Sequence, residues 1–79
     1  MKKIMVVDDE ESIRFLYKEE LEEEGYAVEV ARSGEETLEK YPSLKPDIIT
    51  LDIKMPGMDG IETLRRLREL DKELPIILC

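Results

Sequence analysis

Histidine is absent from this 79-residue chain, and cysteine occurs once, at Cys79. Without histidine the chain lacks the commonest transition-metal ligand and the commonest general base, and it cannot itself carry a phosphohistidine. The single cysteine excludes an internal disulfide and favours a reducing compartment, so we expect a cytoplasmic protein. No signal peptide is recognisable and no apolar run is long enough to cross a membrane, so we expect no membrane partner.

Positive charge is also scarce, because 12 lysines and arginines stand against 20 aspartates and glutamates, for a net charge of −8. This balance argues against nucleic acid or an anionic membrane surface as a partner, since both are polyanions. It favours a metal ion or a basic protein surface. Part of the acidity has a simpler reading, since a run of glutamates is usually a solvated helix face. That run consists of Glu19, Glu20, Glu22, Glu23 and Glu24.

The length of the chain allows one small domain, residues 1–79, with no room for a second functional module. Short apolar runs alternate along it with segments of helical periodicity. The predicted strands are 4–7, 27–31, 47–51 and 75–79. The predicted helices are 11–24, a short one that begins near Ser33, and 61–70. A helix between each pair of successive strands predicts parallel pairing in an open α/β sheet.

Local signals mark the helix ends. Gly25 suits the position just past the first helix, where a left-handed residue is needed. Ser33, with Glu36 three residues later, has the spacing of a capping box, so the second helix should begin there. Pro42 is expected to interrupt this helix and keep it short. The glycines of the loop before the third helix should serve backbone geometry, because they form no glycine-rich phosphate-binding motif.

Aspartates stand directly after two of the predicted strands. Asp8 and Asp9 follow the first strand, and Asp52 follows the third. If both strands belong to one parallel sheet, their carboxyl ends lie side by side and the carboxylates converge on one pocket, which would bind a hard cation. Taken singly, Asp8 or Asp9 could cap the helix that follows, and Asp52 could belong to a turn ahead of Pro56. Their shared position at strand ends favours the pocket.

Two motifs contain these aspartates. They are Val6-Val7-Asp8-Asp9-Glu10 and Asp47-Ile48-Ile49-Thr50-Leu51-Asp52-Ile53-Lys54-Met55-Pro56-Gly57-Met58-Asp59-Gly60. Together they resemble the receiver domain of bacterial two-component response regulators. The resemblance runs through the whole chain in register, and the second motif is highly specific. It implies a flavodoxin-like parallel sheet with the element order βαβαβαβ.

The resemblance also implies a chemistry for the aspartates. In receivers, the position of Asp52 accepts a phosphoryl group from a sensor histidine kinase, so the domain is a phosphoacceptor and not an enzyme. A Mg2+ ion is held directly by the positions of Asp9 and Asp52, largely through water by that of Asp8, and by the backbone carbonyl at Lys54. Mg2+ prefers such oxygen ligands, and it would relieve the repulsion among three neighbouring carboxylates.

The end of the chain departs from the receiver pattern. A receiver has a fifth strand and two further helices, a serine or threonine after its fourth strand, and a lysine at the end of its fifth. This chain stops at Cys79. We therefore expect a receiver truncated after the start of the fourth strand, in which signalling and self-dephosphorylation are impaired.

Two alternatives stay open. In the first, the chain is a signalling-inactive receiver fragment that self-associates, as a homodimer formed through an uncovered sheet face or edge near Ile76, Ile77 and Leu78. In the second, it is an unrelated aspartate-nucleophile phosphatase. The second is less favoured, because such enzymes need an aspartate two residues after the nucleophile, where this chain has Lys54.

Overall fold

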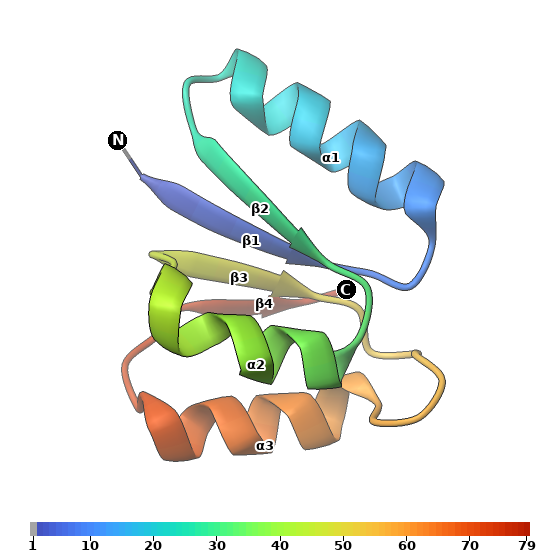
Figure 1. The fold of residues 1–79 in the computed structure, drawn as a ribbon, viewed down its shortest axis with the longest axis vertical. Coiled ribbons are helices and arrows are strands. Elements are labelled where there is room, and N and C mark those ends of the chain that lie inside the picture. Colours follow the sequence, from blue (N-terminus) through green and yellow to red (C-terminus); the bar gives the residue numbers. More distant parts are fainter. Residues whose placement is uncertain (1) are drawn as a thin grey trace.

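Four strands and three helices alternate along residues 2–79, the part of the chain that the computed structural model describes (Figure 1). In chain order they are β1 (Lys3–Val7), α1 (Glu11–Glu23), β2 (Ala27–Ala31), α2 (Gly34–Leu44), β3 (Ile48–Leu51), α3 (Gly60–Leu70) and β4 (Ile76–Leu78). The predicted order of elements is confirmed, with ends that differ by one or two residues. None of these helices combines the length and the apolar character that a membrane crossing requires.

All neighbouring strands are parallel, in the order β2-β1-β3-β4. Val7 of β1 pairs with Ala31 of β2 on one side and with Leu51 of β3 on the other. Leu51 in turn pairs with Leu78 of β4. The strands therefore end along one edge of the sheet, and this strand order is that of the predicted flavodoxin-like sheet.

The larger hydrophobic core lies between the sheet and helices α2 and α3, which cover the same face (Figure 1). Side chains alternate between the faces of a strand, so Met5 and Val7 of β1 and Ile49 and Leu51 of β3 share this side. They are buried together with Leu67 of α3. This core fixes the strands that carry the aspartates.

Helix α1 is the only helix of residues 2–79 on the other face of the sheet, where it lies over β1 and β2 (Figure 1). Ile4, Val6 and Val28 form a smaller core there, against which Leu21 of α1 packs. Over β3 and β4 the same face is open, and the Ile77 side chain is 50% exposed. The predicted exposure of apolar sheet surface is therefore present on this side.

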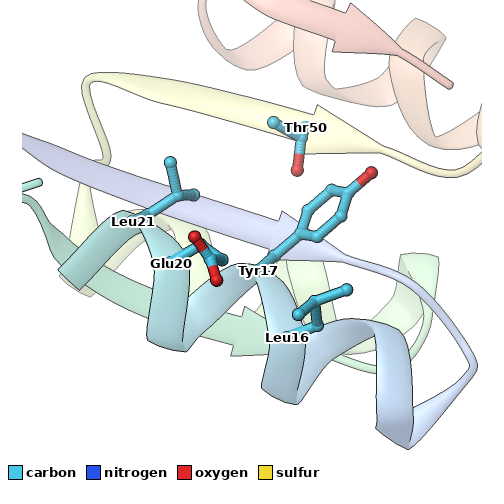
Figure 2. A pocket seen from close by; sticks show the side chains of 5 residues that line it. All are labelled: Leu16, Tyr17, Glu20, Leu21 and Thr50. Atoms are coloured by element: carbon cyan, nitrogen blue, oxygen red, sulfur yellow. The ribbon is translucent and has the colours of Figure 1, made fainter. Parts of the chain in front are cut away.

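A groove runs along the boundary between α1 and the open part of the sheet (Figure 2). Its volume is about 450 Å³. The lining side chains are Leu16, Tyr17, Glu20 and Leu21 of α1 and Thr50 of β3, of which only Glu20 is charged. Figure 2 shows Tyr17 reaching from the helix toward Thr50.

The predicted helix-end signals act largely as expected. Gly25 follows α1 with a φ of +96°, in the region that disfavours a side chain. The Ser33 Oγ accepts a hydrogen bond from the N–H of Glu36 at 3.0 Å, at the start of α2. In return, Glu36 Oε1 accepts from the N–H of Arg32 at 2.7 Å, one residue earlier than in a standard capping box.

The prediction that Pro42 interrupts the second helix is wrong. Helix α2 continues through Pro42 to Leu44. Proline has no N–H to donate to the carbonyl of Leu38, so the helix loses one hydrogen bond there, but only two residues of α2 follow Pro42. The helix ends at Leu44 because the next residue, the C-cap Lys45, has a left-handed φ of 43° and donates its N–H to the Tyr41 carbonyl.

We predict that Leu67→Ala lowers the free energy of unfolding by about 3 kcal/mol, because it leaves a cavity between α3 and the sheet. Leu70→Ala in the same helix is the matched control, with an expected loss below about 1 kcal/mol. Leu67 has no exposed surface, whereas Leu70 is 56% exposed. Urea unfolding followed by circular dichroism measures both. Equal losses from the two variants would contradict this description of the core.

Candidate functional site: an acidic cluster at the carboxyl edge of the sheet

Three aspartates meet at the edge where β1 and β3 end. Asp8 and Asp9 follow β1, and Asp52 follows β3. The Asp52 N–H donates to the Val7 carbonyl at 3.0 Å, which continues the strand pairing into the site. Each aspartate offers a carboxylate oxygen, and these oxygens lie within 4.8 Å of one another. The predicted convergence of the three carboxylates is thus present in the structure.

Asp8 is held at three of its polar groups. Its N–H donates to the Ala31 carbonyl at 3.1 Å, and its Oδ1 accepts from the N–H of Glu10 at 2.9 Å. Its carbonyl accepts from Nη1 of Arg14 at 2.7 Å. The alternative in which Asp8 or Asp9 caps the first helix is realised only in part: the N-cap of α1 is Glu10, and Asp8 Oδ1 accepts from its N–H, one of the free N–H groups at the helix start.

Asp52 is half-buried beside the other two aspartates, and its pKa is raised above the ordinary value of 3.8. Partial burial is the main cause, since it disfavours the charged form. The Lys54 N–H opposes this shift by donating to Asp52 Oδ1 at 3.1 Å. The negative charges of Asp8 and Asp9 raise the pKa further. Burial and the neighbouring charges therefore raise the free energy of the ionised form of Asp52 relative to its neutral form.

The loop between β3 and α3 packs tightly against the backbone of Asp52. The Gly60 N–H donates to the Ile53 carbonyl at 2.9 Å, and a Cβ at Gly60 would collide with the backbone of Asp52 and Ile53. Gly57 has a φ of +74°, which favours glycine. The loop glycines serve backbone geometry as expected, and Gly60 does so by close approach to the site.

The acidic cluster suits a hard divalent cation. Its donors are carboxylate oxygens, which Mg2+ prefers, and Mg2+ is usually held by a few carboxylates together with several waters. Asp9 is exposed and the other two aspartates are partly accessible, so an ion can reach them. Lys54 lies beside the cluster through its N–H, and the role of its carbonyl as a ligand stays a prediction.

Residues 4–79 match the family described as the response regulator receiver domain. The chain belongs to the receiver family. Receivers are phosphoacceptor modules of two-component signalling and not enzymes in the usual sense. The resemblance predicted from the two aspartate motifs is therefore confirmed, and the acidic cluster occupies the motif positions that suggested it.

Curated relatives and solved structures agree with this membership. The alkaline phosphatase synthesis transcriptional regulatory protein PhoP of Bacillus subtilis is 49% identical over 77 residues, which are 98% of this chain and 32% of PhoP. The chemotaxis protein CheY of Thermotoga maritima is 40% identical over 79 residues, 99% of this chain and 66% of CheY. This receiver chain thus spans about a third of PhoP and just under two thirds of CheY.

The response regulator TrrA of Thermotoga maritima has been solved in two complexes that superpose on this receiver. In complex with Mg2+-BeF it gives a TM-score of 0.94 at 51% identity, covering 99% of this chain and 68% of TrrA. In complex with the histidine kinase ThkA it gives a TM-score of 0.92 at 51% identity, covering 99% of this chain and 67% of TrrA.

Sequence reasoning identified all three aspartates of the cluster but missed Arg14. The relevant signal was weak: Arg14 is the only basic residue in the first seven positions of α1. Nothing in the helical periodicity indicates that its side chain turns back to the Asp8 carbonyl. That contact depends on the path of the loop between β1 and α1, which the sequence pattern does not describe.

We predict that Asp52→Asn raises the thermal midpoint at neutral pH in the absence of divalent cations. The folded pKa of Asp52 lies above 3.8, so its stabilising contribution is complete below the unfolded pKa and is lost as the pH rises through the folded pKa. Asparagine stays neutral at every pH. The gain over wild type should therefore shrink on acidification and vanish below about pH 4. Calorimetry across this range measures it.

Asp71→Asn is the control, for which we expect the thermal midpoint at neutral pH to change in the opposite direction. The N–H of Glu73 and then the hydroxyl of Tyr41 hold the pKa of Asp71 below 3.8. Its stabilising contribution is present above the unfolded pKa and lost as the pH falls through the folded pKa, so Asp71→Asn should lower the neutral midpoint. A neutral midpoint for Asp52→Asn at or below that of wild type would contradict repulsion at the cluster.

Proposed function

We propose that this receiver accepts a phosphoryl group on Asp52 from a phosphorylated histidine of a sensor kinase. The observation that carries the proposal is the meeting of Asp8, Asp9 and Asp52, with ligand atoms within 4.8 Å, in a chain of the receiver family. We further propose that residues 1–79 act as one receiver unit. We place the exchange in the cytoplasm, where the single thiol of Cys79 would remain reduced.

Asp52 is the proposed nucleophile. One of its carboxylate oxygens attacks phosphorus, and the new O–P bond forms as the P–N bond of the phosphohistidine breaks. The imidazole leaves with the bonding electron pair and takes up a proton from water. The Lys54 N–H already engages Asp52 Oδ1, so it orients the carboxylate and leaves the second oxygen for attack. The product is an acyl phosphate, which is labile to hydrolysis.

Asp9 and Asp52 are the proposed direct ligands of a Mg2+ ion, Asp8 a ligand largely through water, and the Lys54 carbonyl a further ligand. When bound, Mg2+ supplies positive charge that offsets the charge of the carboxylates and of the transferring phosphoryl group. The oxygen donors of the cluster support this assignment. So does the relative TrrA, which was solved with Mg2+-BeF and is 51% identical to this chain.

A histidine kinase is the proposed donor for the protein to which this receiver belongs. The support comes from TrrA, which was solved in complex with the histidine kinase ThkA. The net charge of −8 fits neither nucleic acid nor an anionic membrane as the partner of this receiver. The phosphatase alternative lacks support, because Lys54 occupies the place of the second aspartate that it requires.

The decisive experiment is intact-mass spectrometry after incubation with Mg2+ and a small-molecule phosphodonor. We expect the wild-type protein to gain the mass of one phosphoryl group, and Asp52→Asn to gain none. Asp9→Asn keeps the nucleophile but loses a direct metal ligand, so we expect its adduct to form at least about tenfold more slowly. An equal adduct on Asp52→Asn would show that another residue is the acceptor. A folded wild-type protein without an adduct would refute the proposed phosphoacceptor chemistry.

Self-association is a second candidate function, which we propose on a separate observation. At the edge of the described sheet, β4 offers unpaired backbone groups, and its Ile77 side chain is half-exposed beside the open apolar face. Strand pairing between two copies of β4 would form one continuous sheet, in which a twofold axis relates the copies and the two open faces lie side by side. The net charge of −8 on each copy opposes this contact, so salt should strengthen it.

We predict that the wild-type protein sediments as a homodimer and that Ile77→Lys sediments as a monomer. Ile61→Lys is the matched control, because Ile61 is 46% exposed but lies on α3, across the sheet from the groove. It should remain dimeric. Sedimentation velocity at low and high salt tests this, and a compact wild-type monomer in both conditions would exclude the homodimer.

A further inference from the structure

Arg14 connects the first turns of α1 to the backbone of the acidic cluster. Its Nη1 donates to the Asp8 carbonyl at 2.7 Å, a distance typical of a strong charge-assisted hydrogen bond. The side chain is half-buried, whereas its helix neighbours Phe15 and Leu16 are exposed. The phosphoacceptor chemistry proposed above assigns no role to this residue.

The bonded carbonyl belongs to the peptide unit that joins Asp8 to Asp9. A peptide unit is planar, so fixing the direction of the Asp8 carbonyl also fixes the Asp9 N–H and the position of the Asp9 Cα. The rest of Asp8 is already held by the Ala31 carbonyl and the Glu10 N–H. The Arg14 bond is therefore the contact that fixes the orientation of the peptide plane between Asp8 and Asp9.

We propose that Arg14 is a positioning residue for the metal-binding aspartates. It orients the peptide plane between Asp8 and Asp9 and so aims the exposed Asp9 carboxylate toward Asp52. Its guanidinium also places a permanent positive charge at the backbone that carries two of the three acids. This role rests on the proposed Mg2+ site.

Arg68 makes a matched comparison within the same chain. Its Nη1 also donates to backbone carbonyls, the shortest bond being 2.6 Å to the Leu74 carbonyl. That contact lies where the chain passes from α3 to β4, at the amino ends of the strands, whereas the aspartates lie at the carboxyl ends (Figure 1). Loss of Arg68 should therefore remove three bonds of the same kind without touching the acidic cluster.

The test compares Arg14→Met, Arg14→Lys and Arg68→Met by nitrogen-15 NMR. In the metal-free protein, the order parameter of the Asp9 amide should fall in Arg14→Met and remain at the wild-type value in Arg68→Met. In a Mg2+ titration, Arg14→Met should bind about tenfold more weakly than wild type. Arg14→Lys keeps the charge without the rigid fork of donors, so its affinity should fall by only about threefold.

Each outcome decides the proposal. Wild-type Asp9 order and Mg2+ affinity in Arg14→Met would overturn it, as would an equal loss in Arg68→Met, because the effect would then be one of general stability. If wild-type protein itself fails to bind Mg2+, the proposed metal site fails. The Asp9 order parameter in Arg14→Met, measured without metal, then still decides whether Arg14 fixes the peptide plane.

Discussion

The pairing of β1 with β3 is the constraint on which the rest of this structure depends. Val7 and Leu51 are register partners, and the Asp52 N–H extends the pairing by donating to the Val7 carbonyl. A slip of one residue would exchange the faces of every side chain on the strand and move Asp52 away from Asp8. The cores on the two faces of the sheet prevent such a slip, so burial of apolar side chains determines the geometry of the acidic site.

That geometry has a cost, which the site partly offsets with its own backbone. Bringing Asp52 into a half-buried place near two other acids raises its pKa, first through burial and then, against the opposing Lys54 N–H, through the charges of Asp8 and Asp9. N–H groups of Glu10 and Lys54 each donate to one carboxylate oxygen of the cluster. A divalent cation would relieve the remaining repulsion.

Much of this fold could be predicted, because its signals are local. Apolar runs gave the strands, and helical spacing with Ser33 and Gly25 gave the helices and two of their ends. The error at Pro42 arose because a proline near the end of a helix removes one hydrogen bond without ending the helix, which a rule based on residue type ignores. Arg14 was missed because its partner is a loop carbonyl, and the close approach of Gly60 depends in the same way on how two segments pack.

By itself, the sequence determined the order of strands and helices, the placement of Asp8, Asp9 and Asp52 at strand ends, and the resemblance to receivers. These follow from residue type and spacing along the chain, which are properties of neighbouring residues. Only the tertiary structure decided the half-burial that raises the pKa of Asp52, the hold of Arg14 on the Asp8 carbonyl, and the extent of the sheet that α1 covers. These depend on how segments distant in the chain pack against one another, because burial and contact geometry exist only once the sheet has formed.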